Sequence, residues 1–204
     1  MKILNLYAGI GGNRKFWDGH NVDAVESNEQ IAKVYHDLYP DDLLYIEDAH
    51  EYLLRNYQYY DFIWSSPPCQ SHSKMVKFTR HDVRKYPDMK LYEEIIFLQH
   101  FFKGKWVVEN VVPYYKPLIK GVKLGRHYIW ANFDISPFDV KRPKGFMKGV
   151  TRKEMMDWLG VYFDGNIYYE GNHEPLQVFR NCVHPALGLH ILKESQYDKF
   201  NPQQ

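Results

Sequence analysis

The 204-residue sequence predicts an α/β fold with a doubly wound, mostly parallel sheet. Three observations predict it: short apolar runs alternate with segments of helical periodicity, a glycine-rich turn follows the first run, and polar residues stand where the runs end. This length suffices for one buried core with a small appendage. Ligands of such sheets bind at the carboxyl ends of the strands, so these polar residues are the first candidates for a site.

Strands and helices alternate up to residue 56. Gly9-Ile10-Gly11-Gly12 predicts a tight turn after the first strand, because glycine accepts backbone angles that other residues avoid. Asn28 predicts the N-cap of a helix, since apolar residues recur behind it at helical spacing until Pro40. The expected elements are strands over 3–8, 22–26 and 43–46, a helix between Asn28 and Pro40, a helix around 51–56, and a helix or loop from about Trp17.

The same alternation continues to residue 110. A strand over 61–64 ends in Ser65-Ser66-Pro67-Pro68, and a strand over 106–108 ends at Glu109 and Asn110. A helix is expected between these strands, with apolar residues at helical spacing at Leu91, Ile95, Leu98 and Phe102.

Beyond residue 134 the pattern breaks into proline, glycine and basic residues. Thr151, with Glu154 three places on, predicts a capping box that opens one helix, which closes near Gly160. Apolar residues return over 181–192 and predict a final helix on the sheet. The sequence therefore predicts a main domain over 1–133, a small insertion over 134–178, and a return to the main domain over 179–204.

Composition narrows the class of protein. No run approaches the roughly 20 apolar residues of a membrane span, and the N-terminus lacks the apolar stretch of a secretory signal. We therefore expect a cytoplasmic protein. Two cysteines are too few for a disulfide framework or a four-thiolate zinc site, and the ten histidines show no ligand spacing, so no metal is expected.

The net charge of +1 does not by itself predict a nucleic-acid partner. Basic residues nevertheless cluster over 74–90 and 141–153. These clusters can follow a phosphate backbone or form a solvated face, and the sequence leaves both interpretations open.

Three features at strand ends suit a nucleotide-like ligand. The glycine turn allows close approach to the backbone, and Glu26 at the end of the second strand can bond a pair of ribose hydroxyls. Asp48, after the third strand, can accept a hydrogen bond from an adenine amino group.

Cys69 is the candidate nucleophile. Two prolines fix the backbone before it, and polar residues surround it, which favours a reactive thiol over inert packing. Cys182, beside Val183 and Pro185, is expected to be inert packing. Glu109 is expected at the same edge of the sheet as Cys69. A thiol and a carboxyl that converge suit addition to an aromatic ring with a proton transfer to a ring nitrogen.

Ordered motifs resemble those of the DNA cytosine-5 methyltransferase family, with the small size of a phage or bacterial member. Tyr7-Ala8-Gly9-Ile10-Gly11-Gly12 resembles the cofactor loop, with Tyr7 where phenylalanine is usual. Pro68-Cys69-Gln70, with Ser73, resembles the nucleophile loop, and Glu109-Asn110-Val111 resembles the Glu-Asn-Val motif.

Two further motifs depart from the family pattern. Arg126-His127-Tyr128 resembles the tail of a motif that normally carries two arginines, of which Arg126 alone is present. Asn181-Cys182-Val183 resembles the closing motif, with Arg180 where glycine is usual. The resemblance covers about residues 3–133 and 178–192.

The resemblance implies a Rossmann-like, S-adenosylmethionine-dependent methyltransferase that acts on cytosine in DNA. Cys69 would add to C6 of a base flipped out of the duplex, Glu109 would hold and protonate N3, and Arg126 would hold O2. The insertion over 134–178 would recognise the target. The implied cofactor-binding residues are Tyr7, Ala8, Gly9, Gly11, Gly12, Glu26, Asp48, Ala49, Pro68, Leu91, Asn181 and Cys182. The candidate DNA-binding residues are Gln70 and Ser73 of the nucleophile loop and, from their charge, Lys141, Arg142, Lys144 and Arg152 of the insertion.

Other functions fit part of this pattern. An RNA cytosine methyltransferase would share the chemistry, although the sequence shows no added RNA-binding module. A non-catalytic DNA-binding relative would keep the fold but not require Cys69 and Glu109. A thymidylate-synthase-like enzyme would use a Pro-Cys nucleophile but not the glycine turn. We expect a monomer, with a partner subunit left open.

Overall fold

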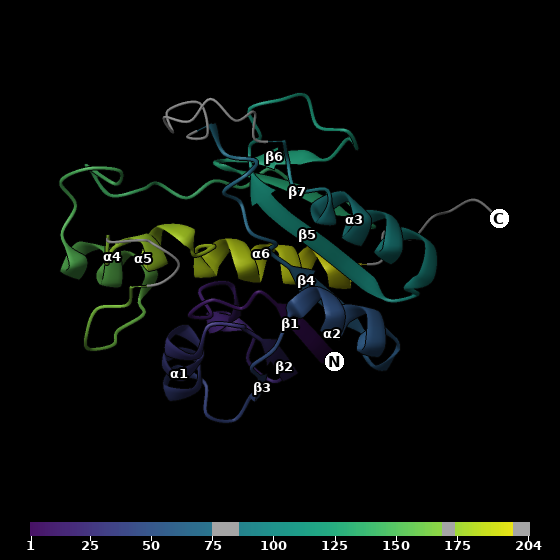
Figure 1. Ribbon diagram of the computed structural model, residues 1–204, viewed down its shortest axis with the longest axis horizontal. Coiled ribbons are helices and arrows are strands. Elements are labelled where there is room, and N and C mark those ends of the chain that lie inside the picture. The colour runs from purple at the N-terminus through teal and green to yellow at the C-terminus, as the bar shows by residue number, and fades with distance from the viewer. Residues whose placement is uncertain (75–85, 169–173, 198–204) are drawn as a thin grey trace.

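The computed structural model describes residues 1–74, 86–168 and 174–197. They form a seven-stranded sheet in the order β3-β2-β1-β4-β5-β7-β6 (Figure 1). The first five strands of this order run parallel, and the last two pair antiparallel. The predicted doubly wound, mostly parallel sheet is confirmed. The strands are β1 (Lys2–Leu6), β2 (Asn21–Val25), β3 (Leu43–Tyr45), β4 (Phe62–Ser65), β5 (Lys105–Val111), β6 (Val122–Leu124) and β7 (His127–Ala131).

Helices cover both faces of the sheet. On one face, α2 (Ala49–Asn56) and α3 (Lys90–Phe101) bury their apolar sides against alternate residues of β1, β4 and β5. On the other face, α6 (Pro185–Gln196) packs on the sheet together with Trp17, which follows the 3-10 helix η1 (Asn13–Phe16). α1 (Glu29–Leu38) covers the same side, where Tyr35 contacts Ala24 of β2.

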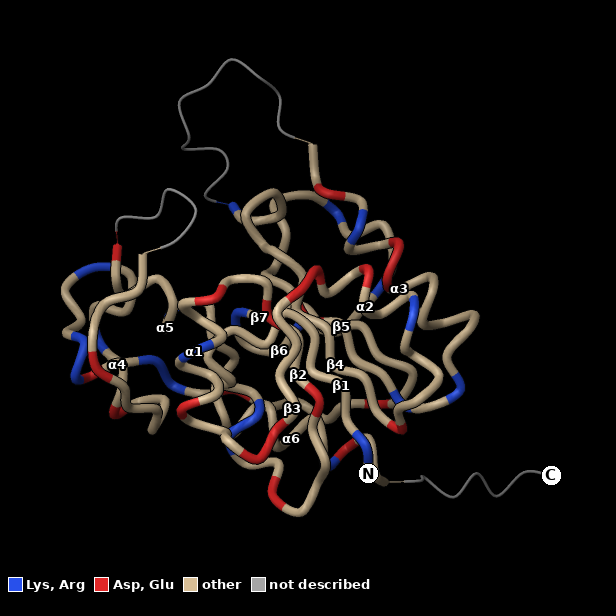
Figure 2. Tube along the Cα trace, turned by 60° about the horizontal axis from the view of Figure 1, so that its bottom comes forward, with Lys and Arg blue, Asp and Glu red and all other residues tan. Residues whose placement is uncertain are grey.

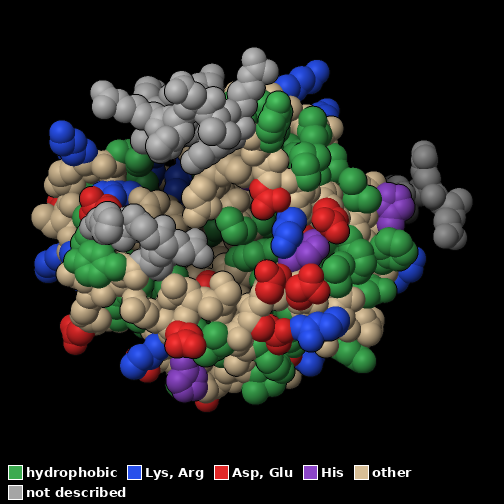
Figure 3. Space-filling view, viewed as in Figure 1, with side chains coloured by type: hydrophobic (Ala, Val, Ile, Leu, Met, Phe, Trp, Pro, Cys, Tyr) green, Lys and Arg blue, Asp and Glu red, His purple; other side chains and the backbone are tan. Residues whose placement is uncertain are grey.

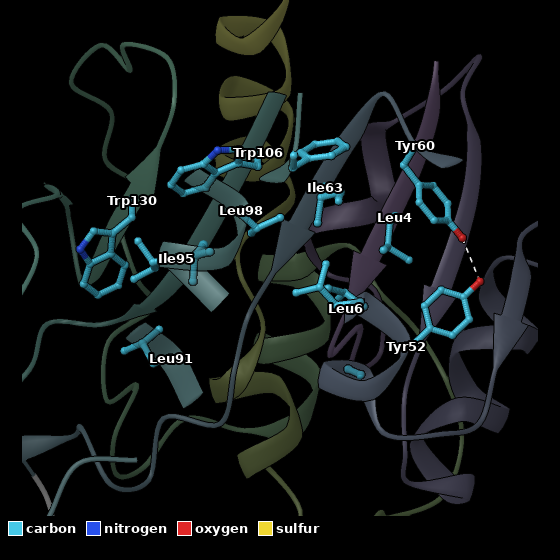
Figure 4. Close-up of a cluster of buried hydrophobic side chains, with 14 of the residues drawn as sticks. Leu4, Leu6, Tyr52, Tyr60, Ile63, Leu91, Ile95, Leu98, Trp106 and Trp130 are labelled. Carbon is cyan, nitrogen blue, oxygen red and sulfur yellow. Dashed lines mark hydrogen bonds between the residues drawn. The ribbon is translucent and has the colours of Figure 1, made fainter. Parts of the chain in front are cut away.

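Figure 4 shows the first of these cores. Side chains from α3 point toward those of β1 and β4, and the Tyr52 and Tyr60 hydroxyls, 2.9 Å apart, join α2 to the segment before β4. The labelled residues are all under 9% exposed: Leu4, Leu6, Tyr52, Tyr60, Ile63, Leu91, Ile95, Leu98, Trp106 and Trp130. This core fixes the strands whose carboxyl ends carry the candidate site.

The described residues of the insertion, 134–168 and 174–178, pack on the main domain. Thr151 and Glu154 form the predicted capping box of α4 (Arg152–Leu159), and Gly160 closes the helix in the left-handed conformation. Met155 and Leu159 of this helix share a cluster with Ile10 of the glycine turn and with Phe179 of α5 (Gln177–Asn181). Helix α4 of the insertion therefore packs against the glycine turn and supports it.

Most predicted elements agree with the structure within two or three residues. The final helix predicted over 181–192 is instead two helices, α5 and α6, and the 3-10 helix η2 (Tyr57–Tyr59) extends α2. One prediction about the site is wrong: Glu109 does not follow a strand but lies inside β5, which continues to Val111 and pairs with β7. A carboxylate inside a buried strand needs a partner, and here His127 on the neighbouring strand provides a hydrogen bond to Glu109. The strands β6 and β7 were not predicted.

Candidate active site

The glycine turn leaves open space beside Gly9. Tyr7 and Gly9 both have positive φ angles, of 54° and 56°, so the chain turns sharply after β1. The Gly9 N–H donates to the Glu26 carboxylate over 3.0 Å. A Cβ atom built on Gly9 would meet nothing within 4 Å. This open backbone beside a carboxylate fits the adenosyl part of a cofactor.

Gly11 and Gly12 allow close packing behind the turn. A Cβ on Gly11 would lie 2.3 Å from the Tyr39 ring, and one on Gly12 would lie 2.5 Å from the Val183 carbonyl oxygen. Cys182 is buried at the same place, and burial raises the pKa of its thiol to about 12. Gly11, Gly12 and Cys182 thus pack together behind the turn, and their role in cofactor binding stays a prediction.

Two acidic residues follow β2 and β3 at this edge. Glu26 is half-buried, and its second oxygen accepts from the Asn28 N–H at 2.9 Å. Asp48 is exposed and caps α2 by accepting from the Glu51 N–H at 2.9 Å, ahead of the buried Ala49. A carboxylate oxygen accepts more than one hydrogen bond, so both groups keep capacity for a ligand.

A buried carboxylate that the sequence reasoning missed joins this turn to β4. Glu94 of α3 is fully buried and accepts from the Tyr7 hydroxyl at 2.6 Å and the Ser65 hydroxyl at 2.5 Å. Nδ1 of His50 lies 3.1 Å away. Burial and Glu94 raise the pKa of Tyr7, and the hydrogen bond to Glu94 raises the pKa of His50. Glu94 lies between Leu91 and Ile95 on the apolar side of its helix. This position is the sequence signal that could have revealed a buried carboxylate.

The Glu-Asn-Val motif holds the nucleophile loop. The Asn110 amide donates to the Pro67 carbonyl oxygen over 2.9 Å, two residues before Cys69. The N–H groups of His72 and Ser73 donate to the Cys69 carbonyl oxygen at 3.0 Å. Cys69 is half-buried, and burial followed by the Glu109 charge raises the pKa of its thiol, while Arg126 lowers it. These hydrogen bonds fix the loop that carries the thiol, and burial favours the protonated form of the thiol.

Glu109 is buried beside the nucleophile loop. Nδ1 of His127 lies 2.5 Å from one of its oxygens, and the Ser66 hydroxyl also bonds to it. Burial alone would raise the pKa of Glu109, but the charge and hydrogen bond of His127 together lower it.

Arg126 lies just before β7 and is anchored in the fold. Its Nη1 and Nη2 atoms donate to the carbonyl oxygens of Arg180 and Cys182, at 2.7 and 2.5 Å. Burial lowers its pKa, and its charge interacts with both Glu109 and Cys69. Two of its five N–H groups are used by these carbonyls, so others remain for a ligand.

The other predicted residues lie in different environments. Pro68, Gln70, Lys141, Arg142, Lys144 and Asn181 are exposed, and Ser73 is half-buried. Arg152 has a structural role, because its guanidinium donates to the Phe163 carbonyl oxygen and to Asn166 and covers the Phe163 ring. Leu91 is 2% exposed and packs in the core, while Ala8 and Ala49 are also buried.

The view of Figure 3 shows a hollow near the centre of the molecule, with acidic side chains beside it. Within the three described ranges, every helix is too short or too polar to cross a membrane. The same ranges contain no group of three or more histidine, cysteine or acidic side chains arranged for a metal ion.

The model of the C-5 cytosine-specific DNA methylase family matches residues 1–114, more than half of the 204-residue chain. No curated protein matches the sequence. Among solved structures, DNMT2 of Spodoptera frugiperda is 25% identical, with a TM-score of 0.38 over 54% of this chain and 35% of its own. This chain thus spans about a third of the length of that protein.

Two further structures are similar to this chain. The methyltransferase EhMeth of Entamoeba histolytica is 14% identical, with a TM-score of 0.47 over 75% of this chain and 62% of its own. A SAM-dependent methyltransferase of Agrobacterium tumefaciens is 16% identical, with a TM-score of 0.39 over 56% of this chain and 40% of its own.

Proposed function

This chain belongs to the family of C-5 cytosine-specific DNA methylases, and from that premise we propose that it methylates carbon 5 of cytosine in DNA through a covalent adduct with Cys69. It is a methyltransferase with a Rossmann-like fold, and its cofactor is S-adenosylmethionine. The residues that would hold the cofactor are the Tyr7–Gly12 turn with its open side at Gly9, and the carboxylates Glu26 and Asp48.

The observation that carries the proposal is the hydrogen bond from Asn110 to the Pro67 carbonyl oxygen. β4 and β5 are neighbours, with Ser65 paired to Val108, so their continuations meet at one edge of the sheet. The Asn110 bond then fixes the loop that carries Cys69 against the strand that carries Glu109. A nucleophile and an acid held at one edge suit attack on a pyrimidine ring.

These residues would divide the chemistry as follows. Sγ of Cys69 adds to C6 of the flipped base, while Glu109 binds N3 and gives it a proton, so that C5 becomes nucleophilic. When bound, S-adenosylmethionine supplies the methyl group to C5. Removal of the C5 proton by a base then lets Cys69 leave by elimination. Arg126, fixed by two carbonyl oxygens, would use a remaining N–H group to hold O2 of the base.

The residues proposed to contact DNA lie on the loop after Cys69 and on the exposed segment before α4. Gln70 and Ser73 follow the nucleophile, and Lys141, Arg142 and Lys144 lie in the segment before α4. Lysine and arginine that contact phosphates position a duplex without reading its sequence.

The test is covalent trapping with DNA that contains 5-fluorocytosine, in which fluorine replaces the proton that elimination requires. Wild-type protein with S-adenosylmethionine should form an adduct that survives denaturation, and Cys69→Ala should form none while it binds the cofactor normally. A wild type that methylates DNA but never forms the adduct would overturn the covalent mechanism.

An RNA arm of the same experiment separates the remaining alternatives. Trapping on RNA but not on DNA would favour an RNA cytosine methyltransferase. Cofactor and DNA binding without methylation or trapping would favour a non-catalytic relative. The family match leaves the thymidylate-synthase-like alternative without support.

A further inference from the structure

His127 on β7 makes a contact that the proposed mechanism does not yet use. Its Nδ1 atom lies 2.5 Å from Oε1 of Glu109 on the neighbouring strand, and each residue is 6% exposed. The register pairs Glu109 with Ile129 and Val111 with His127, so His127 and Glu109 are diagonal neighbours on one face of the sheet. Two ionisable groups are therefore held together by the backbone of two paired strands.

The imidazole also borders open space. His127 lines a cavity of about 350 Å³ together with Arg126, Trp158 and His184. Polar walls of this kind admit water. His127 thus stands between a buried carboxyl group and a cavity that can exchange protons with solvent.

Beside the charge of His127, Glu109 is a poor source of a proton. The charge and hydrogen bond of His127 outweigh burial and lower the pKa of Glu109, so the group is a carboxylate at neutral pH. Cytosine N3 nevertheless has to gain a proton when Cys69 adds to C6. A second group must therefore hold that proton before the base arrives.

We propose that His127 supplies the proton that Glu109 delivers to cytosine N3, and that the cavity beside His127 replenishes it. This inference rests on the proposed function. His127 acts through Glu109 and is a positioning and proton-supplying residue.

The proton balance closes within the pair and the substrate. One proton leaves Nδ1 of the His127 imidazolium for Oε1 of Glu109, and the carboxyl group turns about its Cγ–Cδ bond and gives the proton to N3. Glu109 begins and ends as a carboxylate, and His127 ends as a neutral imidazole. When the modified base leaves, N3 returns its proton through Glu109 to His127, and the cavity replaces any proton that the pair has lost to solvent.

The charges around His127 come from several parts of the fold. Arg126 precedes it in the chain, and Cys69 and Ser66 approach Glu109 from the end of β4. The segment before α4 and the start of α6 contribute the remaining polar groups of the cavity, which are Asp139, Lys141, Arg142 and His184.

The experiment measures the single-turnover rate of adduct formation on 5-fluorocytosine DNA from acid to alkaline pH. Wild type should give a bell-shaped profile, because the thiol of Cys69 must be ionised and His127 must be protonated. His127→Gln keeps a hydrogen-bonding side chain, but its neutral amide cannot take up and pass on the proton. It should lose the wild-type descending limb, because Glu109 then titrates without the imidazolium beside it. It should also react roughly 10–100-fold more slowly at neutral pH, less than the ~10²–10⁴-fold loss of a whole general acid.

Two further variants make the result interpretable. His127→Arg keeps a positive charge beside Glu109 but cannot release its proton, so it should also lose the alkaline limb and stay slow. His100→Gln, an exposed histidine of α3 outside the site, should match wild type. S-adenosylmethionine affinity, measured by calorimetry, should be unchanged in all three and serves as the control for folding.

An unchanged bell-shaped profile in His127→Gln would overturn the inference. Full recovery of the rate in His127→Arg would also overturn it, because charge alone would then suffice. Both results leave the proposed function intact, since wild type would still react. A wild type that neither methylates nor traps cytosine would overturn the proposed function, and with it this inference.

Discussion

At the scale of single residues, Glu94 connects several parts of the candidate site. Its fully buried carboxylate accepts hydrogen bonds from Tyr7 of the glycine turn and from Ser65 at the end of β4, and His50 lies against it. The hydroxyl of Tyr7 stands where family members usually have none. Glu94 explains how that hydroxyl is tolerated, because a buried polar group without a partner would be costly.

We predict that Glu94→Gln lowers the free energy of unfolding by about 1–3 kcal/mol, the cost of leaving a buried polar group unsatisfied. Glu93→Gln is the matched control, since Glu93 is exposed on the same helix and solvent screens its pairing with His50, which should contribute about 0–1 kcal/mol. Urea unfolding at neutral pH measures both. Equal stability of the two variants would show that the Glu94 contacts contribute little.

The pair of His50 and Glu94 also predicts a pH dependence of the free energy of unfolding. The hydrogen bond to Glu94 raises the pKa of His50. The contribution of the His50–Glu94 hydrogen bond to the free energy of unfolding is therefore complete below the ordinary histidine pKa of about 6.5. It is lost as pH rises through the higher pKa that His50 has in the folded state. Glu94→Gln should flatten this part of the stability profile.

At the scale of elements, α4 depends on its capping box. The Thr151 hydroxyl accepts from the Glu154 N–H at 3.2 Å, and the Glu154 carboxylate accepts from the Thr151 N–H at 2.7 Å. Thr151→Ala removes the first bond and should cost about 1 kcal/mol, whereas Thr151→Ser keeps it and should cost little. Chemical unfolding compares the two, and similar losses in both would argue against the cap. Because α4 packs on Ile10, cofactor affinity should fall slightly in the alanine variant.

The elements show what a sequence can and cannot predict here. Local signals sufficed for α1 and α4, because the caps at Asn28 and Thr151 lie beside the residues that they bond. Glu109 was misplaced at a strand end, because its partner His127 is 18 residues away and nothing local reveals it. The short strands β6 and β7 were missed for the same reason, since the pairing of β7 with β5 and of β6 with β7 defines them.

The candidate site follows the same division. Cys69, Glu109 and Arg126 were identified from motifs, and the structure brings their charges within mutual influence. Glu94 and His127 were missed, because their importance lies in contacts between distant segments. Arg152 was assigned to DNA from its charge alone, and its contacts to Phe163 and Asn166 show why charge is a weak guide.

At the scale of the whole molecule, the insertion offers little surface for reading DNA. Figure 2 shows several Lys and Arg positions along the trace around α4. Direct reading takes several side chains, each good bidentate pair giving about 1–3 kcal/mol of discrimination, so we predict a short or degenerate target of about two to four base pairs. Sequencing of methylated random DNA measures this, and a strict target of about six or more base pairs would contradict it.

DNA binding should also weaken steeply with salt. If Lys141, Lys144 and Lys148, all exposed, contact phosphates, changing each to Gln should reduce the slope of log affinity against log salt by about 0.9 per contact. Lys103→Gln, exposed after α3, is the control and should leave the slope unchanged.

The close approach of Gly12 to Cys182 and Val183 also has a consequence for synthesis on the ribosome. The glycine turn leaves the exit tunnel early, but the residues that pack behind it are made some 170 positions later. In a nascent chain the glycine turn would therefore lack the support of Cys182 and Val183 until translation has passed α5. The enzyme would acquire its cofactor late, and ribosome-bound intermediates would not compete for the cellular methyl donor.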